Sequence, residues 1–306
     1  MIRTVDLHKR FGETDAVNNL SFSVARGEIF GIVGPDGAGK STLLRLLAGI
    51  LEQSSGSIEV MGKDIFKDRY GLKENLAYMP QRFGLYEDLT VEENIYFFGR
   101  LFGLSRKAII ERIPALYSFS KLGAFSDRLA GKLSGGMKQK LGLACCLVHS
   151  PGLILLDEPT NGVDPVSRRE FWKILYDLLA DGVTIVVTTA YLDEAERCNR
   201  VAMMHNGTFI TSGSPAGIKS SIGGTMLEIM TDNVWDCGKY LEESGRFRNI
   251  IREGSSIKVF VAGRDKGMTD IKKILAGKNI RVHGIRESAP SLENCFMEIT
   301  SSGEGE

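Results

Sequence analysis

The sequence predicts an α/β protein with a helical subdomain and a small α+β domain at its C-terminal end. One apolar run, 28–33, leads into the glycine-rich segment 34–42, and an apolar stretch with helical spacing, 43–49, follows it. A second apolar run, 153–158, ends in two adjacent carboxylates. Buried strands rarely end in paired acids unless a cation faces them. Both runs therefore predict strands of a sheet that ends at a site for a charged ligand.

Segment 34–42 matches the phosphate-loop pattern G-x-x-x-x-G-K-[ST] between a strand and a helix. Its glycines let the backbone bend around an anion, and the helix that follows adds its positive end. We expect Lys40 to reach the β- and γ-phosphates of a nucleotide and Ser41 to offer its hydroxyl to Mg²⁺. The loop by itself predicts a P-loop NTPase of unspecified kind. The predicted contacts are Gly34, Pro35, Asp36, Gly37, Ala38, Gly39, Lys40, Ser41 and Thr42.

Composition limits the function classes. The 306 residues suffice for one large and one small domain, and the 38 basic residues balance the 38 acidic ones, so nothing favours nucleic acid as a partner. No apolar run approaches the length of a membrane span, and the first residues lack the core of a signal peptide. We expect a cytoplasmic protein. The five cysteines lack metal-site spacing and are predicted to be small apolar fillers.

Two predicted strands, 2–7 and 20–24, precede the phosphate loop, with Phe11 in the turn between them. An exposed aromatic side chain there could stack on adenine, or Phe11 could pack into the core. The sequence leaves both open. Further strands are predicted at 56–62 and 75–81. The second ends on Gln81, whose amide oxygen can serve Mg²⁺ or an attacking water at the carboxyl end of the strand.

The chain from about 86 to 148 has a helical pattern. Thr90 and Glu93 form a capping box, and Ser105 begins another helix that Pro114 is expected to break or kink.

Ser134 is a natural N-cap, and the two glycines after it, Gly135 and Gly136, leave the next helix start open. This is a second anion-receptive helix terminus, far along the chain from the first.

Asp157 suits the surroundings of Mg²⁺, and Glu158 suits a general base for water. A turn, a helix from 167 to 179, a strand at 183–188 and a helix at 192–198 are expected next.

Asn206-Gly207 predicts a hairpin between strands 201–204 and 208–211, with His205 solvated at its tip. Residues 212–215 form a predicted boundary between a domain at 1–213 and one at 214–306. The second domain is predicted to hold strands at 225–230, 257–261, 280–285 and 295–299 and helices at 234–244 and 268–276.

The ordered motifs resemble those of the ATP-binding subunit of an ABC transporter. They are GPDGAGKST, Met-Pro-Gln, LSGGMKQK, LILLDEP and GVDP, and the resemblance covers residues 1 to about 213. LSGG distinguishes this family from other P-loop proteins, such as kinases and GTPases, which lack it. SLENCFMEIT resembles the tail of the small C-terminal domain in drug- and lipid-exporting members.

The resemblance implies a role for each motif residue. Phe11 corresponds to the aromatic that stacks on adenine, and segment 34–42 to Walker A. Gln81 corresponds to the glutamine that senses Mg²⁺ and links to the membrane partner. Ser134, Gly135 and Gly136 correspond to the signature that clasps the γ-phosphate of the opposite subunit. The acidic positions correspond to Walker B (Asp157), the catalytic base (Glu158) and the D-loop acid that crosses the dimer (Asp164).

One position departs from the family. The switch histidine is replaced by Ala190, which can neither hydrogen-bond the γ-phosphate nor hold water in line with Glu158. Loss of one such donor costs on the order of 10²–10³ in rate. We therefore predict tight ATP binding and weak hydrolysis at this chain's own site. A heterodimer in which this chain lends its signature to an active partner would tolerate that loss, and a slow homodimer remains open.

The resemblance implies transmembrane permease subunits and a second ATP-binding subunit as partners, on the cytoplasmic face of the membrane. Export is favoured only by the C-terminal tail. Segment 78–93 is the predicted docking groove, with an ordinary packed loop as its alternative. Two other functions stay open. They are a regulatory subunit that binds ATP without hydrolysing it and a soluble ABC ATPase of DNA repair or translation.

Overall fold

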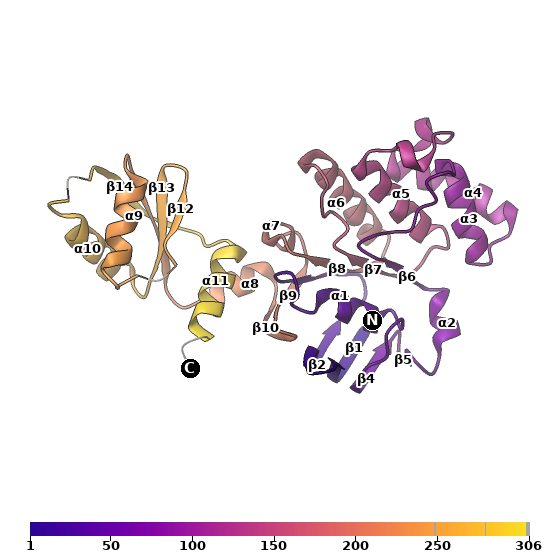
Figure 1. Ribbon diagram of the computed structural model, residues 1–306, viewed down its shortest axis with the longest axis horizontal. Coiled ribbons are helices and arrows are strands. Elements are labelled where there is room, and N and C mark those ends of the chain that lie inside the picture. Colours follow the sequence, from indigo (N-terminus) through magenta and orange to yellow (C-terminus); the bar gives the residue numbers. More distant parts are fainter. Residues whose placement is uncertain (248, 279, 304–306) are drawn as a thin grey trace. The chain divides into compact units, whose positions relative to one another are not determined.

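A computed structural model describes residues 1–247, 249–278 and 280–303. The chain divides into two compact units, Met1–Ser212 and Gly213–Glu306 (Figure 1).

The first sheet of the larger unit is antiparallel, with the order β2-β1-β4-β5. Its strands are β1 (Ile2–Phe11), β2 (Thr14–Val24), β4 (Ser55–Val60) and β5 (Lys63–Asp64). The prediction that Phe11 lies in a turn is wrong, because β1 extends to this residue. Arg10 near the end of β1 donates two hydrogen bonds to Asp15 of β2, at 2.6 and 2.8 Å, and thereby extends the hairpin.

The second sheet has the order β10-β9-β3-β8-β7-β6, and its pairs β9-β3, β3-β8, β8-β7 and β7-β6 are parallel. Every residue of β3, β7 and β8 is buried, as expected where both faces of a parallel sheet are covered. The predicted hairpin at Asn206-Gly207 is confirmed. The strands are β3 (Ile29–Val33), β6 (Leu76–Met79), β7 (Leu153–Asp157), β8 (Thr184–Thr189), β9 (Arg200–His205) and β10 (Thr208–Gly213).

Helix α1 (Lys40–Leu47) lies between the two sheets, where it contacts β2, β7 and β8 (Figure 1). Its apolar side chains Leu43, Leu44, Leu46 and Leu47 are fully buried in the core that joins the sheets. Full burial of a leucine contributes about 1.5–3 kcal/mol. The core therefore holds the phosphate-loop end of α1 in place.

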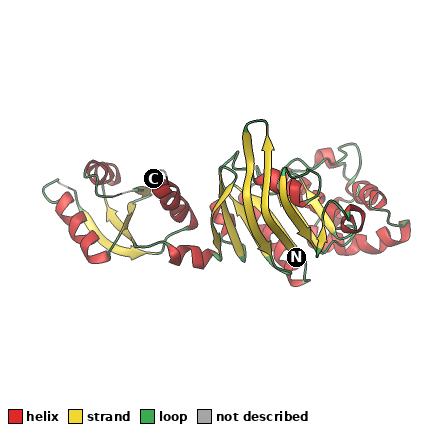
Figure 2. Cartoon of the chain, turned by 90° about the horizontal axis from the view of Figure 1, so that it is seen from below, coloured by secondary structure: helices red, strands yellow, loops and turns green. Residues whose placement is uncertain are grey.

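Helices α3 and α4 lie at the outer edge of this unit in Figure 1, and Figure 2 shows the same helical lobe in red beside the yellow strands. The predicted capping box of Thr90 and Glu93 is confirmed. Helix α4 continues through Pro114, so no break occurs there. The carbonyl that loses its donor belongs to Ile110, a residue that is 52% exposed. The helices are α2 (Arg69–Lys73), α3 (Val91–Leu101), α4 (Arg106–Ser120), α5 (Gly135–Leu147), α6 (Pro165–Ala180) and α7 (Leu192–Ala195), with short 3₁₀ turns η1 (Gly123–Phe125) and η2 (Ala130–Lys132).

Two further expectations for this unit need correction. Helix α7 ends at Ala195, three residues earlier than predicted. His205 is not a solvated hairpin tip, because it ends β9, is partly buried and has a backbone carbonyl that accepts a hydrogen bond from Thr208 at 2.9 Å.

The smaller unit has one antiparallel sheet with the order β12-β13-β11-β14. Its β-α-β-β-α-β succession from β11 to β14 is a split βαβ arrangement. The elements are α8 (Pro215–Ser221), β11 (Thr225–Thr231), α9 (Val234–Glu243), β12 (Ile251–Glu253), β13 (Ser256–Val261), α10 (Arg264–Leu275), β14 (Val282–Ser288) and α11 (Leu292–Gly303).

The strand predicted at 295–299 is wrong, because these residues belong to α11. Leu292 and Cys295, three positions apart, are both fully buried, which is a helical period. In a short apolar run, the two-residue period of a strand cannot be told from the 3.6-residue period of a helix. The α/β fold class itself is confirmed. All five cysteines are buried, and burial raises the pKa of Cys146 to about 12.

Within the described ranges, no helix combines the length and the apolarity needed to cross a membrane.

Candidate nucleotide-binding site

A pocket of about 610 Å³ opens where the phosphate loop meets the carboxyl ends of the central strands. Segments that are far apart in the sequence line it. They are 14–16, Asp36, Gly37, 39–42, Gln81, Glu158 and 206–207.

The phosphate loop adopts the bent backbone that its glycines predict. Gly39 has a φ of 105°, and a Cβ there would lie 2.1 Å from the carbonyl oxygen of Ala16. No other residue fits this position without moving β2. The glycine therefore lets the loop pack directly against the backbone of β2.

Lys40 is 4% exposed, which is rare for a lysine. Its Nζ donates to the carbonyl oxygens of Gly34 and Pro35, at 2.8 and 3.0 Å, and lies 3.0 Å from Oε1 of Glu158. A desolvated ammonium held by carbonyls and one carboxylate can exchange that carboxylate for phosphate oxygens.

Asp157 receives hydrogen bonds from three elements. Ser41 Oγ and Thr188 Oγ1 donate to its Oδ1, at 2.9 and 2.8 Å, and Tyr78 Oη donates to its Oδ2 at 3.4 Å. Burial, helped by the Asp157 charge, raises the pKa of Tyr78, so the phenol keeps its proton and remains a donor. The predicted pair of Ser41 and Asp157 is thus brought together.

Glu158 occupies a left-handed backbone conformation, with a φ of 46°. Its Oε2 accepts from Gln81 Nε2 at 3.1 Å and from Asn161 Nδ2 at 3.2 Å, while Thr188 Oγ1 accepts its backbone N–H at 2.9 Å. Strained φ values of this kind cluster at functional sites. The structure therefore joins Glu158 to Gln81, as well as to Lys40.

The oxygen set at the loop suits Mg²⁺. Ser41 hydroxyl, Asp157 carboxylate and the Gln81 amide are hard ligands, and Mg²⁺ in nucleotide sites keeps several waters and phosphate oxygens besides one or two protein groups. No group of three or more His, Cys, Asp or Glu side chains with metal-site spacing occurs among the described residues. The residues present fit a magnesium ion held jointly with a nucleotide rather than by the chain alone.

Phe11 is 49% exposed, so the alternative in which it packs into the core is wrong. The Lys9 ammonium lies 5.1 Å from the centre of its ring. Phe11 pairs across the hairpin with Thr14, which lines the pocket. Its stacking on adenine stays a prediction.

The signature residues lie outside this pocket. Ser134 caps α5 as predicted, since its Oγ accepts the Met137 N–H at 3.3 Å. Gly136 permits close packing, because a Cβ there would lie 2.5 Å from Ser167 at the start of α6. Nothing lies within 4 Å of a Cβ built on Gly135. One chain alone does not bring this helix start to its own phosphate loop.

Asp164 has a local role inside the chain. Its Oδ1 caps α6 by accepting the N–H groups of Ser167 and Val166, at 2.9 and 3.1 Å. The Ser167 N–H contributes most to holding the pKa of Asp164 below its ordinary value.

Ala190 is exposed and directly follows β8. Beside it, Thr189 Oγ1 donates to Glu194 Oε2 at 2.8 Å and accepts the Tyr191 N–H at 3.0 Å. The guanidinium of Arg168 lies 4.3 Å from the centre of the Tyr191 ring.

Sequence reasoning missed several side chains of the site. Thr188 and Tyr78 both bind Asp157, and Asn161 binds Glu158. Thr188 carried the same clue as Gln81, a polar residue near the carboxyl end of a predicted strand. Asp15 lines the pocket and has its pKa lowered to about 2, mainly by the hydrogen bond from Arg10, and no sequence clue indicated it.

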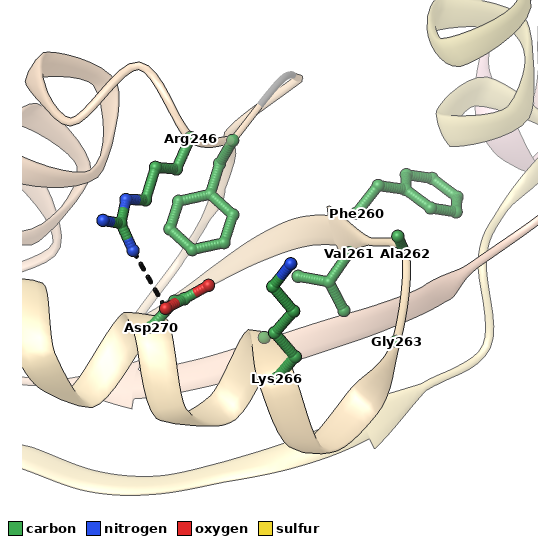
Figure 3. A pocket seen from close by; sticks show the side chains of 9 residues that line it. Arg246, Phe260, Val261, Ala262, Gly263, Lys266 and Asp270 are labelled. Atoms are coloured by element: carbon green, nitrogen blue, oxygen red, sulfur yellow. Dashed lines mark hydrogen bonds and ion pairs between the residues drawn. The ribbon is translucent and has the colours of Figure 1, made fainter.

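A second pocket, of about 500 Å³, lies in the smaller unit (Figure 3). Asp270 and Lys266 rise from α10, and Arg246 reaches Asp270 at 2.9 Å. Arg246 is 59% exposed, so this ion pair remains hydrated. None of the residues that line this pocket offers a buried charge comparable with Lys40.

Known proteins resemble this chain closely. Residues 17–161 match the family model of the ABC transporter. The probable multidrug ABC transporter ATP-binding protein YbhF of Escherichia coli (strain K12) is 41% identical over 96% of this chain, which spans 51% of that protein's length. The Nod factor export ATP-binding protein I of Rhizobium sp. (strain N33) is 38% identical over 95% of this chain and 94% of its own length.

Among solved structures, cbiO1 from Clostridium perfringens, part of the ABC transporter complex cbiONQ, superposes with a TM-score of 0.66 at 29% identity. The match covers 72% of this chain and 90% of cbiO1. Since the likeness to the Rhizobium protein extends over nearly its whole length, the chain belongs to the ABC transporter ATP-binding proteins, a family of ATP-binding, ATP-hydrolysing subunits.

Proposed function

We propose that this chain powers export through separate membrane subunits and that its own ATP site turns over slowly. One observation carries the proposal. Lys40, Ser41, Gln81, Asp157 and Glu158 meet at the phosphate loop, while Ala190, which directly follows β8, has no polar side chain. The names of the relatives, a multidrug ATP-binding protein and Nod factor export proteins, support export.

In the proposed site, the Lys40 ammonium leaves Glu158 and binds the β- and γ-phosphates. Ser41, Gln81 and Asp157 would hold Mg²⁺, which would supply positive charge beside the phosphates. Glu158, freed from Lys40, accepts a proton from the attacking water. Tyr78 and Thr188 hold the Asp157 carboxylate in place through the hydrogen bonds already described.

Hydrolysis at this site slows because the γ-phosphate lacks one donor. Ala190 offers no group that stabilises charge in the transition state, whereas binding depends on the loop and Lys40. ATP therefore binds tightly and is hydrolysed slowly.

A second ATP-binding subunit completes the site. The start of α5 at Ser134, Gly135 and Gly136 lies outside the chain's own pocket and is open at Gly135, which supports its placement over a partner's nucleotide. Phe11 stacks on adenine, and Asp164 lies at the contact between the two subunits. An asymmetric pair, in which the other subunit has the histidine, makes use of this chain's intact signature.

Residues 1–213 form the ATPase domain, and 214–306 form the accessory domain. Permease subunits dock at segment 78–93 on the cytoplasmic side of the membrane. An aromatic cluster supports this surface. Tyr86 is 48% exposed and packs on Phe97 at 4.5 Å between ring centres, while Phe83 packs on Phe98 at 5.0 Å.

The test is a comparison of wild type with Ala190→His in single-turnover ATP hydrolysis. The histidine should raise the rate by about 100- to 1,000-fold, the range that one transition-state donor supplies, with little change in ATP affinity. Glu158→Gln in both backgrounds is the control for contaminating ATPase. Equal rates for wild type and Ala190→His would contradict the proposal that Ala190 slows ATP hydrolysis.

A regulatory subunit is the second candidate function, and Ala190 is the observation that favours it. In that case wild type binds ATP, and its residual turnover does not fall when Glu158→Gln is introduced.

A further inference from the structure

The carboxylate of Glu194 in α7 is fully buried and bridges two loops. Thr160 Oγ1, from the loop after β7, donates to its Oε1 at 2.7 Å. Thr189 Oγ1, at the end of β8, donates to its Oε2 at 2.8 Å. Each carboxylate oxygen therefore holds a different segment of the chain.

A cation balances this buried charge. Arg168 Nε of α6 lies 3.4 Å from Glu194 Oε1, and the same guanidinium covers the Tyr191 ring. A buried carboxylate is tolerated only with such compensation. The cluster thus links α6, α7 and both loops through one side chain.

The two loops carry the parts that hydrolysis depends on. Thr160 lies two residues after Glu158, and its neighbour Asn161 donates to Glu158 Oε2 at 3.2 Å. Thr189 immediately precedes Ala190, and its Oγ1 accepts the Tyr191 N–H at 3.0 Å. Glu194 therefore sets the spacing between the segment of the proposed base and the segment of the missing histidine.

We propose that Glu194 is a positioning residue for ATP hydrolysis. It holds the loop that carries Glu158 and the segment that carries Ala190 at a fixed distance from each other. Glu194 is not among the residues that line the nucleotide pocket. Its effect therefore falls on the alignment of the attacking water and not on ATP binding. The inference rests on the proposed role of Glu158, and it is independent of whether Ala190 slows the reaction.

The chain offers a matched control in Glu28. This carboxylate is also buried, at 8% exposure, accepts the Ala25 N–H at 2.7 Å and pairs with Arg200 at 3.1 Å. The hydrogen bond and the ion pair of this carboxylate go to Ala25 and Arg200, which lie outside both loops that Glu194 bridges. Glu28→Gln therefore measures what loss of a buried carboxylate does to folding alone.

The experiment measures single-turnover hydrolysis, ATP affinity and melting temperature for Glu194→Gln and Glu28→Gln. Glu194→Gln should lower the hydrolysis rate about 10- to 100-fold, because a small displacement of Glu158 misaligns it with the attacking water. ATP affinity should stay within about 2-fold of wild type. Glu28→Gln should lower the melting temperature and leave the rate unchanged. Equal rates for the two variants overturn the proposal, as does a loss of affinity that accounts for the whole effect.

Two milder variants keep the test decisive if Glu194→Gln fails to fold. Thr160→Val and Thr189→Val each remove one arm of the bridge, and each should slow hydrolysis without weakening ATP binding. Unchanged rates in both would refute a positioning role.

Pairing with Ala190→His separates this inference from the proposed function. Ala190→His should accelerate hydrolysis less in the Glu194→Gln background than in the wild-type background, because the added histidine is misaligned when Glu194 is replaced. The same acceleration in both backgrounds overturns the positioning role. No acceleration in either background rejects the attenuation, and the rate of Glu194→Gln alone still decides the role of Glu194.

Discussion

The nucleotide pocket and the pocket of the smaller unit in Figure 3 are similar in volume, about 610 and 500 Å³, but differ in the burial of their charged side chains. In the first, Lys40 pairs with Glu158 at 3.0 Å, and in the second, Arg246 pairs with Asp270 at 2.9 Å. The side chains of the first pair are 4% and 9% exposed, whereas those of the second are 59% and 20% exposed. Desolvated charges interact strongly and hydrated ones weakly. Burial of the charges, rather than pocket volume, therefore distinguishes the nucleotide site.

The largest expected effect is on folding. Lys40→Met leaves the Glu158 carboxylate buried without its cation, which costs about 3–5 kcal/mol of unfolding free energy. Arg246→Met breaks the hydrated pair and costs about 0–1 kcal/mol. Urea denaturation of both variants tests the contrast, and similar losses would show that burial does not separate the pockets.

Glu158→Gln should separate binding from chemistry. The variant loses the proposed base, and single-turnover hydrolysis should fall by at least about 10²-fold, the lower end of general-base contributions. ATP affinity should rise, because the carboxylate no longer competes with phosphate for Lys40 at 3.0 Å. Calorimetric titration checks the affinity, and weaker binding than wild type would contradict the competition.

Loss of a threonine hydroxyl should lower stability at the nucleotide site and leave it nearly unchanged in the smaller unit. Thr188→Val removes a buried donor to Asp157 and the acceptor of the Glu158 N–H, at a cost of about 1–3 kcal/mol. Thr269→Val removes an exposed hydrogen bond to the Asp265 carbonyl and should change stability by less than about 0.5 kcal/mol. Thermal unfolding of both variants measures the difference.

The smallest expected effect concerns pH. Burial lowers the pKa of His149 from 6.5, where it stacks on Phe102 at 3.8 Å between ring centres. The unfolded chain therefore binds a proton more readily than the folded one, and stability falls as pH drops below about 6.5. His149→Gln should flatten this part of the stability profile. An unchanged slope in denaturation curves between pH 7 and pH 5 would contradict the burial effect.

The site was more predictable than the edges of the fold. The phosphate loop, Gln81, Asp157 and Glu158 follow from strand ends and glycine spacing, because local chemistry dictates them. Tyr78 was not predictable, because it contacts Asp157 only through sheet pairing between β6 and β7.

The errors in the predicted secondary structure also arise where contacts between distant residues decide the structure. The end of β1 is polar and exposed, so no apolar alternation marked it, and a hairpin ion pair extends the strand to Phe11. Residues 295–299 are mostly apolar and form a short run that fits either a strand or a helix, and only packing within the smaller unit selects the helix.

Titration of ATP into wild type, Lys40→Met and Arg246→Met tests the difference between the pockets most directly. Each hydrogen bond to a charged group contributes about 1.5–3 kcal/mol, so Lys40→Met should weaken ATP binding by roughly 10- to 100-fold or more. Arg246→Met should bind ATP as wild type does. Wild-type affinity in Lys40→Met, or an equal loss in Arg246→Met, would contradict the assignment of the nucleotide site.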